Sequence, residues 1–98
     1  MAGRTPLPVA RSMRRIASNL DLARRQQRIT VELLAERANI SAPTVRRLLN
    51  EGAGSLENFL RIARILGLLQ SVEESTDPLN TPVGRARAEL DVPERVRR

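Results

Sequence analysis

Apolar side chains recur at intervals of three and four residues early in the chain, the spacing that places them on one face of a helix. This pattern predicts a helix over about residues 10–27. Its buried stripe is expected to be Met13, Ile16, Leu20 and Ala23. The preceding residues 1–9 hold two prolines, so they are expected to form a flexible N-terminal arm.

Two short amphipathic helices joined by a tight turn are predicted next, over about residues 30–37 and 42–50. Small or apolar residues on their facing sides favour a steep crossing, and they are Leu34, Ala35, Ala38, Ile40, Val45 and Leu48. Thr30 and Ser41 are expected to cap the two helices, because a hydroxyl can accept a hydrogen bond from the first turn. Asn39 lies at the turn, where a left-handed backbone is tolerated.

A fourth helix is expected to begin after Ser55, which follows a loop at residues 51–54. Its apolar face is predicted to be Leu56, Phe59, Leu60, Ala63 and Leu66. Gly67 can end or bend this helix, and a short fifth helix is predicted over about residues 68–75. No strand signal is present in residues 1–76. The prediction for residues 10–76 is therefore an all-α domain, a compact bundle of five helices.

The tail, residues 77–98, carries its own local signals. Asp77-Pro78 predicts a turn, and Thr81 followed by Pro82 predicts a capped helix start. A short helix would place Val83, Ala86 and Leu90 on one face. The closing PERVRR is basic and expected to be extended. Two interpretations of the tail are open. It is either a disordered segment or a segment that docks a partner protein.

Composition removes several classes of function. The chain has 98 residues, no cysteine and no histidine, so disulfides, thiolate metal sites and the usual general base are excluded. No paired acids, activated nucleophile or glycine-rich phosphate loop is present. We therefore predict that the chain is not an enzyme and needs no cofactor or metal. No signal peptide or membrane span is apparent, so a soluble cytoplasmic protein with no membrane contact is expected.

Positive charge is concentrated at the start of the chain. Residues 1–28 contain seven arginines and one aspartate, whereas the other two thirds are close to neutral. Basic side chains beside a presented helix suit contact with nucleic-acid phosphates. The phosphate-contact candidates are Arg14, Arg15, Arg24, Arg25 and Arg28. A solvated charged face is the alternative reading.

The second helix of the helix-turn-helix pair is the candidate for reading base pairs. Its exposed face is predicted to offer Ala42, Thr44, Arg46, Arg47 and Asn50. Arginine can bridge the acceptors of guanine, and a threonine methyl can meet thymine. The alternatives for the two arginines are phosphate contact or pairing with Glu51. Asn50 could hold a phosphate or cap the helix end, and Thr44 could be a plain helix position.

Residues from about Ile16 to Leu69 resemble the Xre/Cro family of helix-turn-helix DNA-binding domains. The matching residues are Leu20, Arg24, Ile29-Thr30, Leu34-Ala35, Ile40-Ser41, Thr44-Val45, Leu48, Gly52 and Ser55-Leu56. The resemblance implies a five-helix bundle that places residues 42–50 in the major groove and binds a two-fold operator as a homodimer. The DNA-binding candidates are Thr30, Ser41, Ala42, Pro43, Thr44, Arg46, Arg47 and Asn50. Those for a dimer contact are Leu68, Leu69 and Val72.

The chain departs from the family pattern at three positions. Val31 stands where the family usually has a glutamine that contacts the DNA backbone. Leu49 stands where a glutamate often pairs with the arginine matched by Arg24, so Arg24 is expected to meet Glu36 or a phosphate instead. Asn39 replaces the turn glycine. Val31 and Leu49 support an alternative, a helix-turn-helix interaction module without operator reading.

The tail is similar to the ends of HipB-like antitoxins, which are encoded with HipA-type kinase toxins in bacteria. The shared elements are the Asp77-Pro78 turn, the segment GRARA and the closing PERVR. The predicted function is a repressor that acts as a HipB-like antitoxin and regulates its own operon. A stand-alone Xre-type repressor is the alternative. The predicted partners are an operator duplex, a second copy of the chain and a HipA-like toxin.

Overall fold

The computed structural model describes residues 3–90, and these residues are all-helical, which confirms the predicted fold class. The elements are α1 (Leu7–Gln26), α2 (Val31–Ala38), α3 (Ala42–Glu51), α4 (Leu56–Ile65), α5 (Leu69–Thr76), the 3-10 turn η1 (Pro78–Asn80) and α6 (Pro82–Ala86). The predicted closing segment PERVRR lies outside the described residues.

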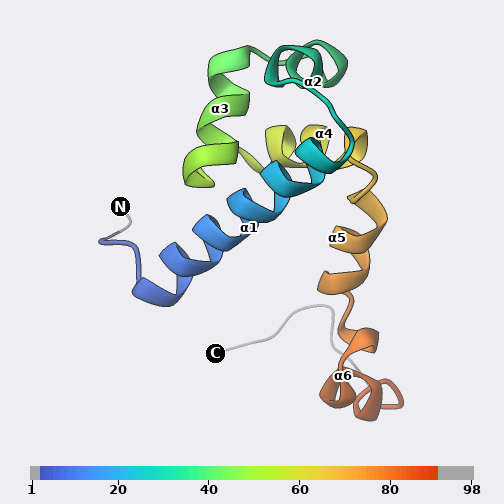
Figure 1. Ribbon diagram of the computed structural model, residues 1–98. Coiled ribbons are helices and arrows are strands. Elements are labelled where there is room, and N and C mark those ends of the chain that lie inside the picture. The colour runs from blue at the N-terminus through green and yellow to red at the C-terminus, as the bar shows by residue number, and fades with distance from the viewer. Residues whose placement is uncertain (1–2, 91–98) are drawn as a thin grey trace.

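The first four helices pack around one core, and the remaining elements lead away from it. α3 packs against both α1 and α2. α4 packs against α2 and also contacts α5. Figure 1 shows α2 and α3 at one end of the molecule and α6 at the other, with α5 between α4 and α6. The α2–α3 pair is therefore presented at one extremity of the fold.

The helix boundaries follow local capping chemistry. Thr30, Ser41 and Ser55 each accept a hydrogen bond from the backbone N–H three residues later, which confirms the predicted caps. Asn39 adopts the left-handed conformation expected at the turn, with φ 57°. The predicted start of α1 at Ala10 is wrong, because the helix begins at Leu7. Its first turn accommodates Pro8, where no backbone N–H is needed.

Within residues 3–90 the buried core contains only apolar residues. The buried set is Ala17, Leu20, Ile29, Leu34, Ala35, Ala38, Val45, Leu48, Leu49, Ile62, Ala63 and Leu66. Two predicted core positions are wrong, since Leu56 is 70% exposed and Ile16 is 43% exposed. Ala17 and Ile62 are buried in their place. Leu56 stands in the first turn of α4, and Ile16 lines two hollows that are open to solvent, so neither side chain is fully covered.

The end of α3 approaches the backbone of α1 so closely that only glycine fits there. Gly52 has φ +71°, and a Cβ atom at this residue would lie 2.3 Å from the carbonyl oxygen of Met13. A larger residue would have both a strained backbone and a clash with a rigid helix. Gly52 thus fixes how far α3 lies from α1.

Arg24 is held by groups close to it in sequence. Its guanidinium donates to Asp21 Oδ1 at 2.8 Å and 3.0 Å, and to the carbonyl oxygen of Ile29 at 2.9 Å. The expected pairing with Glu36 is therefore wrong. Asp21 supplies the acid that Leu49 cannot, and the network ties the end of α1 to the turn before α2.

The described part of the tail forms a small capped unit. Asp77 accepts a hydrogen bond from the Leu79 N–H, and Thr81 accepts one from the Gly84 N–H, as expected for a turn and a helix cap. α6 ends at Ala86 and does not reach Leu90, so the predicted face of Val83, Ala86 and Leu90 on one helix is wrong. Beyond α6 the chain continues in tighter turns closed by hydrogen bonds between residues three apart, such as that from the Leu90 N–H to the Arg87 carbonyl oxygen.

Candidate nucleic-acid interface

The N-terminus of α3 is fixed by two hydroxyl groups. Ser41 Oγ accepts a hydrogen bond from the Thr44 backbone N–H at 3.3 Å, and the two side-chain oxygens lie 2.7 Å apart. The cap therefore satisfies a free backbone N–H in the first turn of α3 from within the protein. Thr30 caps α2 in the same manner, with Leu33 N–H as donor at 3.1 Å.

The exposed residues of α3 lie on the side opposite its packed face. Val45, Leu48 and Leu49 are buried against the other helices, as predicted. The α3 outer face, which we define as the exposed positions of this helix before its last residue, consists of Pro43, Arg46, Arg47 and Asn50. A helix held on one side and bearing Arg and Asn on the other has the form of a major-groove reader.

Two predicted members of the exposed face are not freely exposed. Ala42 is half-buried and packs against the core, and Thr44 is half-buried beside the Ser41 cap. They lie in the first turn of α3, which rests on α2. The expectation that Ala42 lies on the exposed face is therefore corrected, whereas Pro43 is exposed in the same turn.

Both arginines of the α3 outer face contact a carboxylate. Arg46 Nη2 lies 2.7 Å from Glu32 Oε1, which belongs to the first turn of α2. Arg47 Nε lies 3.6 Å from Glu51 Oε2, the pairing that the sequence left open as an alternative. All four side chains remain about half exposed or more, so a ligand can compete for them. Sequence analysis missed Glu32, because its partner is fourteen residues away.

The predicted phosphate-contact residues divide into available and occupied ones. Arg14, Arg15 and Arg28 are exposed. Arg25 is also exposed, although its Nε lies 3.1 Å from Asp21 Oδ2. Only 17% of the Arg24 side chain is exposed, and its donors serve Asp21 and Ile29. The charge of Arg24 is therefore used within the fold. Helical spacing could have indicated this pair, since Asp21 precedes Arg24 by three residues.

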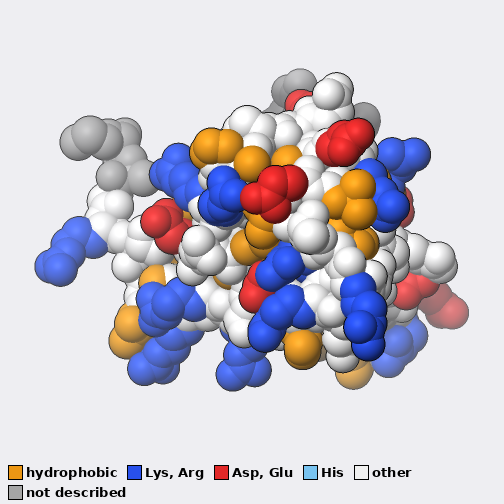
Figure 2. All heavy atoms as spheres, turned by 45° about the horizontal axis from the view of Figure 1, so that its top comes forward, with side chains coloured by type: hydrophobic (Ala, Val, Ile, Leu, Met, Phe, Trp, Pro, Cys, Tyr) orange, Lys and Arg blue, Asp and Glu red, His pale blue; other side chains and the backbone are white. Residues whose placement is uncertain are grey.

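Charge of both signs is visible around the α2–α3 end of the molecule. Figure 2 brings this end forward and shows many blue arginine side chains with red carboxylates set between them. Across the whole sequence arginine outweighs acid, with a formal net charge of +6. The surface is therefore basic overall but locally interrupted by acids beside α3.

Two of the three departures from the family pattern, Val31 and Leu49, have clear structural roles. Leu49 is buried at 5% exposure, and Val31 is half-buried and packs against the core cluster. Val31 offers no hydrogen-bonding side chain where a polar contact to the DNA backbone would be expected. Any such contact at the start of α2 must come from Thr30 or from backbone N–H groups.

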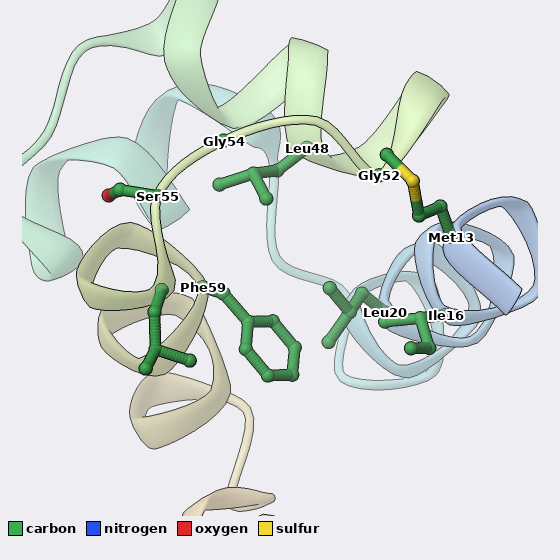
Figure 3. A pocket seen from close by; sticks show the side chains of 9 residues that line it. Met13, Ile16, Leu20, Leu48, Gly52, Gly54, Ser55 and Phe59 are labelled. Atoms are coloured by element: carbon green, nitrogen blue, oxygen red, sulfur yellow. The ribbon is translucent and has the colours of Figure 1, made fainter. Parts of the chain in front are cut away.

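An apolar hollow lies behind the α3–α4 loop. Figure 3 shows Ile16 and Leu20 of α1 facing Phe59 of α4, with Leu48 between them and the loop. The hollow measures about 200 Å³ and contains no ionisable side chain. The side chains that line it are suited to hydrophobic packing and include no group for acid–base chemistry.

The three dimer candidates do not share one surface. Leu68 and Val72 line a hollow of about 460 Å³ between α1, α4 and α5, together with Ile16 and Phe59. Leu69 lines a different hollow, on the side of α4 that carries Leu56. All three side chains are half-buried. A contact through the first hollow would therefore use Leu68 and Val72 without Leu69.

Residues 3–90 show neither a metal-ligand cluster nor a membrane-crossing helix. They bring no three His, Cys, Asp or Glu side chains together in an arrangement that could hold a metal ion. None of their helices is both long enough and apolar enough to cross a membrane.

The fold and the α3 outer face define a helix-turn-helix protein of the DNA-binding class. A family model described as helix-turn-helix matches residues 20–69, half of the chain. The chain belongs to this Xre-like helix-turn-helix family, whose members are DNA-binding regulators. The matched region spans α2, α3 and α4 completely. No curated protein and no solved structure gives a significant match.

Proposed function

We propose that the chain is a sequence-specific DNA-binding repressor that inserts α3 into the major groove. The observation that carries this proposal is the α3 outer face, where Arg46, Arg47 and Asn50 project from a helix whose other side is buried. Arginine pairs with the two acceptors of guanine, and asparagine pairs with adenine, so these residue types suit base reading. Capping by Ser41 holds the helix start in place.

Exposed arginines of α1 and of the turn that follows it support the DNA affinity that the proposal requires. Arg14, Arg15, Arg25 and Arg28 can each neutralise a phosphate and release counterions, which strengthens binding to any duplex. Phosphate contacts position a protein on DNA, whereas base contacts choose the sequence. In this proposal the arginines at α1 contact phosphates, and the side chains of the α3 outer face contact bases.

A homodimer would match a two-fold operator. Leu68 and Val72 line an open apolar hollow, and a second copy could cover it. A symmetric dimer would present two copies of α3 to successive turns of the groove.

The finer proposal is a HipB-like antitoxin with a HipA-type kinase toxin as partner. The segment 78–90, which contains η1 and α6, exposes Leu79, Val83 and Leu90, which lie outside the core. Three large apolar side chains on a capped segment suit docking to another protein. Autoregulation of the operon would then follow from a DNA-binding bundle joined to a toxin-binding tail.

Selection of duplexes from a random pool by the full chain tests the DNA-binding proposal. We expect enrichment of one sequence, with a two-fold repeat if the dimer forms. Titration of the selected duplex against a scrambled duplex of equal composition then gives the specificity ratio. A pool that shows no enrichment at moderate salt would overturn operator reading.

The partner proposal needs a separate test. We expect an adjacent reading frame to encode a HipA-type kinase and the purified kinase to co-elute with the full chain. Failure of the purified kinase to bind the chain would leave the stand-alone repressor.

A second candidate is a helix-turn-helix protein-interaction module. The half-buried Val31, the buried Leu49 and the pairing of both α3 arginines with glutamates favour it. An unenriched pool together with tight binding to a purified protein partner would support this candidate over the repressor.

A further inference from the structure

An ion pair joins α2 to the middle of the α3 outer face. Glu32 Oε1 accepts a hydrogen bond from Arg46 Nη2 at 2.7 Å, across fourteen residues of sequence. The side chains of Arg46 and Glu32 are 49% and 68% exposed, so both groups face solvent. Any ligand that approaches Arg46 therefore also meets the Glu32 carboxylate.

The carboxylate affects phosphates and base edges differently. A phosphate is an anion, so contact with Arg46 places it close to the negative charge of Glu32 and competes for the same guanidinium. The acceptors of guanine carry only partial negative charge, so the carboxylate penalises them less. The guanidinium has five N–H donors, and the bond to Glu32 leaves others free for a base. The ion pair therefore disfavours contact between Arg46 and the DNA backbone more than contact between Arg46 and a base edge.

The pair also matches one base pair chemically. In the major groove a G·C pair presents the guanine O6 and N7 acceptors beside the cytosine N4 donor. Arg46 supplies donors, and the second oxygen of Glu32 supplies an adjacent acceptor. An A·T pair places the adenine amino donor between its two acceptors, adenine N7 and thymine O4, and therefore lacks the adjacent acceptors that a guanidinium bridges on guanine.

We propose that Glu32 is a specificity-determining residue that acts by positioning Arg46. It withholds Arg46 from phosphates and, with it, forms a donor–acceptor unit directed at a G·C pair. This inference rests on the proposed DNA-binding function. It adds a residue of α2 to the reading surface that α3 was expected to provide alone.

Four full-length variants test the inference. Glu32→Gln removes the charge while keeping the shape, Arg46→Gln removes the partner, and the double variant closes a double-mutant cycle. Glu57→Gln is the matched control, because Glu57 holds Arg61 at 2.8 Å on α4, outside the α2–α3 pair. Exposed ion pairs contribute little to folding, so all four variants should melt close to wild type.

Affinity is measured for a scrambled duplex and for the selected duplex over a salt series. For Glu32→Gln on scrambled DNA, we expect the slope of log affinity against log salt to steepen by about 0.9, one added phosphate contact. The specificity ratio should fall about fivefold or more, the low end for one bidentate base contact. Selection with Glu32→Gln should lose preference for G·C at one operator position. Glu57→Gln should change none of these values.

Three results would overturn the inference while leaving the proposed function standing. The first is an unchanged salt slope and specificity ratio for Glu32→Gln. The second is an equal change in the Glu57→Gln control, which would assign the effect to net charge alone. The third is the same effect of Glu32→Gln in the Arg46→Gln background, which would show that Glu32 does not act through Arg46. A wild-type chain without sequence preference would overturn both proposals together.

Discussion

Leu48 and Leu56 carry the same side chain in opposite surroundings. Leu48 is 3% exposed, between α1 and the α3–α4 loop, whereas Leu56 is 70% exposed at the start of α4. The free energy of burying a leucine depends on the area removed from water and on the packing around it. The pair therefore separates the effect of burial from that of residue type.

Leu48→Ala should lower the free energy of unfolding by about 2–5 kcal/mol, because it removes buried methyl groups and leaves a cavity. The matched change Leu56→Ala should alter it by less than about 0.5 kcal/mol. Thermal melts followed by circular dichroism measure both, and a drop of about 8 °C or more in Tm is expected for Leu48→Ala. Equal melts for the two variants would contradict the burial of Leu48.

Arg47 and Arg14 are both exposed arginines, but they stand on helices with different proposed tasks. Arg47 belongs to the α3 outer face, and Arg14 belongs to α1. Arg47→Ala should reduce discrimination between the selected and a mutated operator by about 1–3 kcal/mol. Arg14→Ala should weaken binding to all duplexes by similar factors. Competition titrations with both duplexes measure this, and an unchanged specificity ratio for Arg47→Ala would rule out its base contact.

At the scale of elements, the η1–α6 unit is joined to the rest of the fold through α5. α6 packs on η1, and η1 packs on α5. Its internal order comes from local contacts, including the Thr81 cap and the hydrogen bond from Arg85 Nη1 to the Leu79 carbonyl oxygen at 3.1 Å. Among the residues that the structure describes, every buried core residue precedes this unit in the sequence.

Truncation after Thr76 should therefore leave a folded helical bundle. We expect the shortened chain to keep its helicity and most of its DNA affinity, while it loses binding to the proposed protein partner. Circular dichroism, an operator titration and co-elution with the purified toxin measure the three properties on one protein.

A substitution in the same unit tests its role without shortening the chain. A Cβ atom at Gly84 would lie 1.7 Å from the carbonyl oxygen of Pro78, so Gly84→Ala should disrupt η1 against α6 without shortening the chain. Partner binding should fall for this variant as well. If truncation abolished helicity or dimerisation, the tail would be a structural part of the bundle, and docking would have to be abandoned as its role.

At the scale of the whole molecule, charge and shape act together. The formal net charge of +6 is carried by a molecule whose principal extents are 48 × 31 × 21 Å. The exposed arginines of α1 are on a helix adjacent to α3, because the two helices pack directly against each other. DNA affinity should therefore depend on α1 and α3 together.

Affinity for DNA should fall by orders of magnitude between about 50 and 200 mM salt, since several arginines release counterions on binding. The double variant Arg14→Ala, Arg15→Ala should reduce the slope by about 0.9 for each arginine that contacts a phosphate. Fluorescence anisotropy over a salt series measures the slope. A flat dependence would contradict phosphate contact by α1.

The sequence alone determined the features that depend on residues close together in the chain. The caps at Thr30, Ser41 and Thr81 each need a hydroxyl and an N–H three residues later, and the turn at Asn39 needs a residue that tolerates a positive φ. Helical periodicity likewise indicated α2 to α5, because 3.6-residue spacing follows from one helix and requires no partner.

Only the tertiary structure decided which side chains meet across helices. The pairing of Glu32 with Arg46 and the exposure of Ile16 depend on how α1, α2 and α3 cross and where each one ends. The same holds for Leu68 and Leu69, adjacent residues that face different hollows. Periodicity places a residue on a helix face, but the neighbouring helix determines whether that face is covered, paired or open to solvent.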